Sequence, residues 1–169
     1  MESVDLQGVN MNFRRGGLQA GTTNTFTTTV DLHYAIKGQV YSVAASSNTA
    51  PPVTDALTGL PFVPLAPSKA CCFVFCADGS GLLSVSTKVI QGTIVDLTNE
   101  TDGTDANYVS ALSQWPAVPD TLTVFGWVIV KVGAGGAPWT FGVSNFSSVA
   151  NTLVTFTNGS VLPDRPRSI

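Results

Sequence analysis

The chain has 169 residues, eight Lys or Arg, eleven Asp or Glu and a net charge of −3. This length suits one domain with its own core, and the acidic balance excludes a basic surface for nucleic acid. Apolar runs such as residues 124–130 are far shorter than the roughly twenty residues of a membrane span, so no membrane partner is expected. Only 11% of residues are charged, against about 25% in an ordinary soluble domain. We therefore expect part of the surface to be covered in the working state, as in a subunit of an assembly.

Residues 1–23 show neither a strand period nor a helix period and are predicted to form an extended N-terminal arm. A disordered leader is the alternative for such a terminus. Spaced apolar side chains favour the arm, because they offer anchor points: Leu6, Val9, Met11, Phe13 and Leu18. The first five residues are polar and acidic with no apolar stretch behind them, so no secretory signal is predicted and an origin in a cytosol is expected.

Strand patterning begins near residue 25. Apolar and polar side chains alternate through residues 27–37, which is typical of a strand with one buried face. Gly38 permits a turn, and residues 40–43 predict the returning strand. Residues 46–68, which we call the strap, contain five prolines, and proline cannot donate to a strand ladder. The strap is therefore predicted to be a long ordered loop that covers another part of the fold.

The clearest hairpin follows the strap. Residues 70–77 form a continuous apolar run, as expected of a strand that is covered on both faces. The sequence Asp-Gly-Ser-Gly at 78–81 supplies the turn, and residues 83–89 alternate as the returning strand. Residues 93–97 predict a further short strand.

The next segment is polar and acidic. Residues 98–107 are predicted to form a loop, and residues 106–113 one or two helical turns with Asp105 as the N-cap. A rigid loop with two prolines at 115–120 precedes a long strand over residues 122–132.

The C-terminal part adds the last elements. Gly, Ala and Pro at 133–138 predict a hairpin loop, residues 139–143 its returning strand, and residues 153–157 a final strand. A short Pro-rich tail follows at 163–169. About eight strands with Gly and Pro turns and little helix predict an all-β domain over residues 24–162, an antiparallel sandwich or a jelly-roll-like barrel.

No arrangement of residues predicts catalysis, a cofactor or a metal centre. The only histidine, His33, lies on the polar face of its predicted strand beside Asp31 and has no nucleophile in a recognisable pattern, so a solvent-facing or interface imidazole is favoured. Four carboxylates gather near one loop: Asp96, Glu100, Asp102 and Asp105. Their spacing does not match a calcium-binding EF-hand, and an exposed loop does not raise a carboxyl pKa as a glycosidase requires. Solvated loop charges are expected there, with a cation site as the alternative.

Three cysteines fall within six residues, at Cys71, Cys72 and Cys76. Along a strand, Cys72 and Cys76 share one face but lie about 13 Å apart, whereas a disulfide needs Cα atoms within about 7 Å. Neighbouring Cys71 and Cys72 point to opposite faces. Buried thiols that act as small hydrophobic residues are therefore expected, with a metal or redox role as the alternative.

The three tryptophans, Trp115, Trp127 and Trp139, offer a second kind of site. Trp127 and Trp139 flank the predicted hairpin loop, so we expect them to meet across it in the core or in an interface. A platform on which sugar rings stack is the alternative.

Several blocks of the sequence resemble small virion structural proteins of tailed bacteriophages. The blocks lie at residues 73–81, 115–120, 125–131, 139–142 and 162–166. Across roughly half of the chain, they look most like capsid decoration, or cement, proteins. The resemblance implies a non-enzymatic β-rich oligomer, often a homotrimer, that binds the major capsid protein on the outer capsid surface and assembles in the host cytoplasm. A tail-fibre or receptor-binding β module that contacts host-surface glycans is the alternative.

The distribution of charge indicates where a partner would bind. Between residues 42 and 87 only three residues are charged, Asp55, Lys69 and Asp78, and after Lys131 no charged residue occurs before residue 164. We predict that the strap and the C-terminal segment (residues 131–162) carry much of the contact with a partner. The acidic loop at 96–105 is predicted to remain in water.

Overall fold

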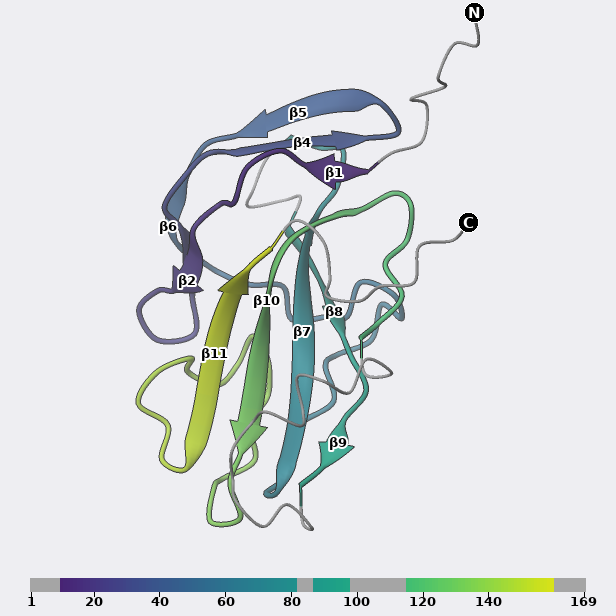
Figure 1. The fold of residues 1–169 in the computed structure, drawn as a ribbon. Helices are drawn as coiled ribbons and strands as arrows, with labels where there is room; N and C mark the ends of the chain where they lie inside the picture. Colours follow the sequence, from purple (N-terminus) through teal and green to yellow (C-terminus); the bar gives the residue numbers. More distant parts are fainter. Residues whose placement is uncertain (1–9, 82–86, 98–114, 160–169) are drawn as a thin grey trace, which may run out of the picture.

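The computed structural model describes residues 10–81, 87–97 and 115–159, which form eleven β-strands and no helix (Figure 1). Every strand pair is antiparallel, and the strands form one large and two small sheets. The predicted all-β antiparallel fold is confirmed. Within the described ranges the sheets stack as in a sandwich, and none of them closes into a barrel.

The large sheet forms the centre of the molecule, in the order β11–β10–β7–β8, with β9 also paired to β7. Its strands are β7 (Lys69–Ala77), β8 (Thr87–Gln91), β9 (Val95–Asp96), β10 (Thr123–Val132) and β11 (Thr152–Asn158). All of β7 except Lys69 is buried, so the prediction of a strand covered on both faces is confirmed. Long apolar strands are the ones that a sheet can bury on both sides.

Two three-stranded sheets lie near one end of the large sheet (Figure 1). One is β1–β4–β5 and the other is β2–β3–β6. Their strands are β1 (Met11–Asn12), β2 (Leu18–Ala20), β3 (Phe26–Thr28), β4 (Leu32–Ile36), β5 (Gln39–Val43) and β6 (Ser46–Thr49). A two-residue turn joins β4 to β5, where Lys37 has φ 49° and Gly38 has φ 80°. Two positive φ values are the mark of the hairpin turn that matches strand twist, which explains the glycine.

The main core lies on the face of the large sheet that carries Phe73, Phe75 and Val128, which we call the inner face. The small sheets, the strap and residues 139–146 all contribute buried side chains to it, including Leu18, Phe26, Leu32, Tyr34, Phe62, Leu65, Trp139, Phe141 and Phe146. A second cluster lies on the opposite, outer face and includes Cys72, Val74, Ile90, Trp127 and Ile129. Side chains along β7 alternate between the two clusters, as the strand period requires.

The described part of the predicted arm, residues 10–23, supplies one strand to each small sheet: β1 pairs with β4, and β2 pairs with β3. Leu18 is buried in the main core, whereas Met11 and Phe13 are exposed. The Asn10 side chain donates to the backbone carbonyl of Leu122 and accepts from the N–H of Lys37. A deletion that reaches residue 23 therefore removes core as well as arm.

The single strand predicted over residues 27–37 is wrong, because the structure divides this segment between two sheets. β3 ends at Thr28 and β4 begins at Leu32. The N–H groups of Thr29 and Val30 donate to the carbonyls of Gly17 and Gly16, which turns the chain from one sheet to the next. The alternating pattern continues through this bend, so periodicity alone does not reveal it.

The predicted hairpin over residues 133–143 is also wrong. β10 pairs with β7 on one side and with β11 on the other, and residues 139–143 form no strand. Gly133 donates to the carbonyl of Asn151, so the ladder continues into the C-terminal strand. Trp139 instead exchanges two backbone hydrogen bonds with Leu65 of the strap.

Other predictions are met in part. Residues 46–49 at the start of the strap form β6, and the strand predicted at 93–97 is reduced to β9. The predicted strands at 40–43, 122–132 and 153–157 are confirmed as β5, β10 and β11. The helical turns at 106–113, most of the acidic loop and the tail lie outside the described residues.

Candidate interaction surface

The strap is bound along one edge of the large sheet by backbone and side-chain hydrogen bonds. Ala56 donates to the carbonyl of Val89 in β8. The Gln91 side chain, at the end of β8, both accepts from the N–H of Val63 and donates to the carbonyl of Val63. Farther along, Leu65 pairs with Trp139, and the buried rings of Phe62 and Trp139 belong to the main core. The strap is therefore held at several points and has a defined conformation.

One buried carboxylate organises the first turn of the strap. Asp55 is 6% exposed, and its Oδ1 accepts the N–H groups of Leu57 at 2.8 Å and Thr58 at 2.9 Å. Its Oδ2 accepts the N–H of Gln91 at 2.6 Å. A buried charge is stable only when its hydrogen-bonding capacity is used, and here backbone donors from both the strap and β8 use it. Asp55 thus fastens the strap to the sheet.

Sequence reasoning assigned no role to Asp55. The signal that identifies it is local, because an Asp followed a few residues later by a Gly is typical of a turn in which the carboxylate accepts the next backbone N–H groups. The segment 55–59 reads Asp-Ala-Leu-Thr-Gly, and Gly59 has φ 70°. The bond to Gln91 comes from tertiary structure and has no sequence signal.

The strap exposes several large apolar side chains and no charged one. Four large aliphatic side chains of the strap are exposed, with Leu60 at 64% and Val53 at 58%: Val53, Leu57, Leu60 and Val63. Gly142 packs against the strap, since a Cβ on Gly142 would lie 2.7 Å from the Pro52 carbonyl oxygen and 3.4 Å from the Val53 Cα. Its neighbour Val143 is 67% exposed. We call the four strap residues together with Val143 the apolar strap surface. Asp55 is the only charged residue of the strap, and it is buried.

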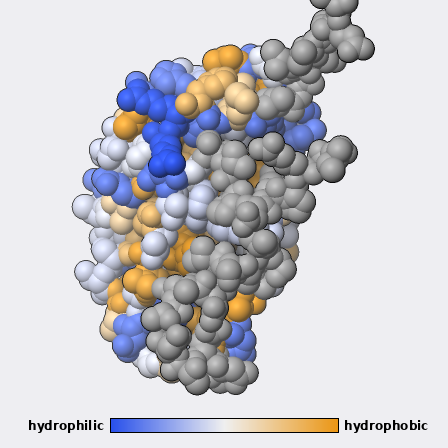
Figure 2. Space-filling view, viewed as in Figure 1, coloured by the Kyte–Doolittle hydropathy of each residue, from blue (hydrophilic) through white to orange (hydrophobic). Residues whose placement is uncertain are grey.

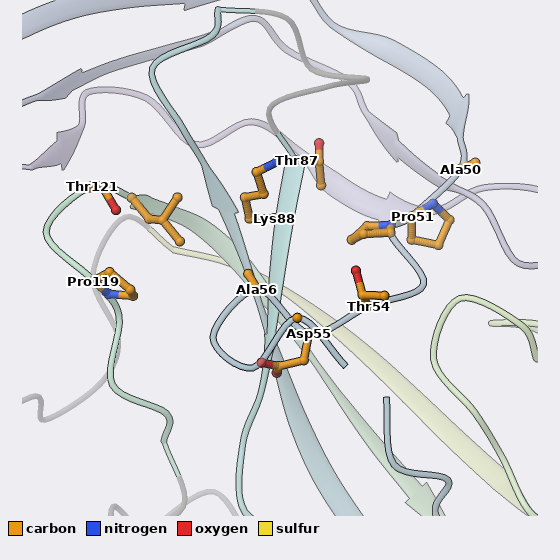
Figure 3. Close-up of a pocket in the computed structure, with 12 residues that line it drawn as sticks. Ala50, Pro51, Thr54, Asp55, Ala56, Thr87, Lys88, Pro119 and Thr121 are labelled. Atoms are coloured by element: carbon orange, nitrogen blue, oxygen red, sulfur yellow. The ribbon is translucent and has the colours of Figure 1, made fainter. Parts of the chain in front are cut away.

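An open pocket of about 520 Å³ lies between the strap, the start of β8 and residues 119–122 (Figure 3). Ala, Pro, Thr, Gly and Leu form most of its lining, and its two charged residues are Asp55 and Lys88. The Asp55 oxygens accept backbone N–H groups, and the Lys88 Nζ lies 3.4 Å from Asp78 Oδ2. Among the described residues that line the pocket, both charges are thus engaged in structural contacts.

His33 and Asp31 do not act together. His33 is half-buried on β4 opposite Ser42, and its backbone carbonyl accepts the N–H of Phe13. The Asp31 carboxylate accepts the N–H of Ala45 at 2.8 Å. The interface role of the imidazole stays a prediction.

Of the four loop carboxylates, the structure describes Asp96 alone. Asp96 is exposed on β9 and forms an ion pair with Lys69. Glu100, Asp102 and Asp105 lie outside the described residues. Within the ranges that the structure describes, no cluster of three or more His, Cys, Asp or Glu side chains is arranged to hold a metal ion.

The predicted contact between Trp127 and Trp139 is wrong, although both rings are in the core. Trp127 lies in the outer-face cluster, where its ring meets Trp115 edge to face at 5.3 Å. Trp139 is fully buried in the main core, and its Nε1 donates to the carbonyl of Asn145. The two rings lie on opposite sides of the large sheet because the predicted hairpin does not form. Buried rings are closed to a sugar, so two of the three tryptophans cannot serve as a stacking platform.

The expectation of free, buried cysteines is confirmed. Cys71 packs in the main core, and Cys72 and Cys76 pack in the outer-face cluster. Burial raises the pKa of the Cys71 thiol to about 12 and raises the pKa of Cys72 well above its ordinary value. A thiol attacks only as the thiolate, so these groups are chemically quiet in the folded protein.

We expect the three thiols to resist a disulfide reagent at pH 8 until the protein unfolds. A thiol that stays protonated when folded but ionises near pH 9 when unfolded stabilises the fold fully below pH 9. That contribution is lost as the pH rises from about 9 to about 12. The measurement is thiol titration with and without denaturant, together with chemical denaturation at pH 8 and pH 10. Rapid labelling of native protein at pH 8 would contradict the burial.

No protein-family model, curated protein or solved structure matches this chain. No helix long and apolar enough to cross a membrane occurs among the described residues.

Proposed function

We propose that this chain is a non-enzymatic structural protein of a tailed-bacteriophage virion, which binds the major capsid protein on the outer capsid surface and stabilises the particle. The observation that carries the proposal is the apolar strap surface, which is exposed, uncharged and firmly held. The block resemblance of the sequence to decoration proteins supplies the class of partner.

The attachment of the strap bears on affinity. Ordering a flexible loop on binding costs roughly 0.5–1.5 kcal/mol for each side chain that is immobilised. Asp55, the Val63–Gln91 bonds and the Leu65–Trp139 bridge already fix the backbone of the strap, so less ordering remains to be done on binding. Aliphatic side chains on a fixed backbone gain free energy when they leave water, about 25 cal/mol for each Å² that is buried.

The proposal predicts that charge on the strap prevents binding to the capsid. We expect Leu57→Glu/Leu60→Glu to lower affinity for capsids that lack this protein by at least about tenfold, since two carboxylates would have to be desolvated in the contact. Binding is measured by co-sedimentation. Because the surface is uncharged, wild-type binding is expected to change little between low and high salt.

Val40→Glu is the matched control. Val40 is 66% exposed on β5, comparable with Leu60 at 64%, but lies outside the strap. This variant is expected to bind capsids as the wild type does. Circular dichroism establishes that all variants fold. Equal capsid binding by the strap variant and the wild type would refute the proposal.

A further inference from the structure

The two edges of the large sheet differ in how they are covered. The β8 edge is covered by the strap, through the Ala56–Val89 bond and the Asp55–Gln91 bond. The opposite edge is β11, the outermost strand of the sheet (Figure 1). Among the described residues, β11 pairs only with β10, in seven consecutive register pairs without a bulge. Figure 2 shows hydrophobic atoms over this strand.

The direction of the free backbone groups follows from two hydrogen bonds next to the strand. Gly133 donates to the carbonyl of Asn151, so the backbone groups of Asn151 face β10. Thr152 donates to Val149, outside the ladder. Since direction alternates along an antiparallel strand, the N–H and C=O groups of Val154 and Phe156 point away from β10. The nearby segment 144–151 contacts β11 through Phe146, whose ring meets Phe156 at 5.3 Å on the inner face.

The sequence of β11 has none of the features that usually prevent edge pairing. Natural edge strands are blocked by Lys, Pro, bulges or short length. β11 is seven residues long, and its sequence, Thr-Leu-Val-Thr-Phe-Thr-Asn, contains no charge and no Pro. Leu153 is 50% exposed and Thr155 is also exposed, and both lie on the outer face.

We propose that β11 pairs antiparallel with β11 of a second copy of this chain, with Thr155 opposite its own symmetry mate on a two-fold axis. In this register Val154 lies opposite Phe156 of the second copy, and the reverse. The outward groups of these two residues then form four N–H···O=C bonds between the subunits. The two five-stranded sheets become one continuous sheet.

The absence of charge favours a second copy over an unrelated strand as the occupant. Around a two-fold axis every side chain near the centre lies opposite itself or a close neighbour, so a charged residue there would repel its own copy. A strand that pairs with a different protein has no such restriction and can use complementary charge. This assembly is a dimer, whereas the resemblance to decoration proteins implies a trimer. It does not depend on the proposed capsid binding.

Charge at Thr155 tests the pairing. Light scattering is expected to give the mass of a dimer for wild type, and of a monomer for both Thr155→Lys and Thr155→Asp. An equal mixture of the two variants is expected to restore the dimer, because opposite charges then face each other across the axis. Thr121→Lys is the control, since Thr121 is exposed but lies off this edge, and it is expected to remain a dimer.

Three outcomes would overturn the proposal. The wild type could remain a monomer at protein concentrations up to about 100 µM, at which even a weak dimer would form. It could form a trimer, or the Thr155→Lys variant could stay dimeric.

The register has its own test. Thr155→Cys is expected to give a covalent dimer on mild oxidation, because residues that face each other in a non-hydrogen-bonded pair are close enough for a disulfide. The native cysteines are buried and do not compete. A dimer of this variant that does not cross-link would exclude Thr155 from the axis.

Discussion

Phe141→Ala is expected to lower the free energy of unfolding by about 4 kcal/mol, the usual cost of removing a fully buried aromatic ring. Phe141 is 0% exposed. Its ring centroid lies 4.7 Å from Phe73 of β7 and 4.9 Å from Phe62 of the strap. It lies 5.5 Å from Phe146. One ring thus joins the large sheet, the strap and the 139–146 segment, and no single neighbour can fill the space that it leaves.

The measurement is chemical denaturation of Phe141→Ala beside Phe141→Leu and Val143→Ala. Leucine keeps most of the volume, so a loss below about 1.5 kcal/mol is expected. Val143 is two residues away and 67% exposed, so its truncation is expected to change stability by no more than about 0.5 kcal/mol. A loss for Phe141→Ala as small as that for Val143→Ala would mean that the aromatic cluster is not packed as described.

Asp55→Ala is expected to lower the free energy of unfolding by about 3 kcal/mol. The substitution leaves the backbone N–H groups of Leu57, Thr58 and Gln91 without their acceptor. The effect is expected to be local first. Without its carboxylate the strap loses a main contact with β8, and a protease is expected to cut within residues 53–61 before the domain unfolds globally. Limited proteolysis followed by mass spectrometry locates the cut.

Asp55→Asn separates charge from geometry. An amide keeps one acceptor for Leu57 and Thr58 but turns an NH₂ toward the N–H of Gln91, so about half of the Asp55→Ala loss is expected. Asp31→Ala is the matched control, because Asp31 is exposed and accepts one backbone N–H, that of Ala45. Asp31→Ala is expected to lower the free energy of unfolding by about 1 kcal/mol. Equal losses for Asp31→Ala and Asp55→Ala would show that the strap is not held by Asp55.

The sequence was informative where burial alone decides the structure. The continuous apolar run that became β7 can be satisfied only by a strand covered on both faces, and it was predicted as such. The prediction of one strand over residues 27–37 was wrong because the alternation of apolar and polar residues continues through the bend at Thr29 and Val30. The bend is held by hydrogen bonds to the carbonyls of Gly16 and Gly17, and no pattern within residues 27–37 predicts these bonds.

The same distinction holds for the candidate surface. The prediction that a partner contacts the strap rests on the scarcity of charge and on the prolines, both of which are readable in a single sequence. The contact that fixes it, between Asp55 and Gln91, joins two elements that meet only in the folded chain. Likewise, Gly and Pro at 133–138 have the composition of a hairpin loop, but the partner of Trp139 is Leu65, far earlier in the chain.

The place of β10 in the large sheet has a consequence for synthesis of the protein. Its neighbour on one side is β7, and its neighbour on the other side is β11, the last strand of the described chain. Because residues 133–151 separate the two strands, a ribosome makes the apolar residues of β10 before their second partner. Pairing between distant segments is slow, and a strand that waits with a free edge is prone to aggregate. We expect the nascent chain to depend on chaperones until the C-terminal strand emerges, and a fragment that ends before residue 152 to be insoluble.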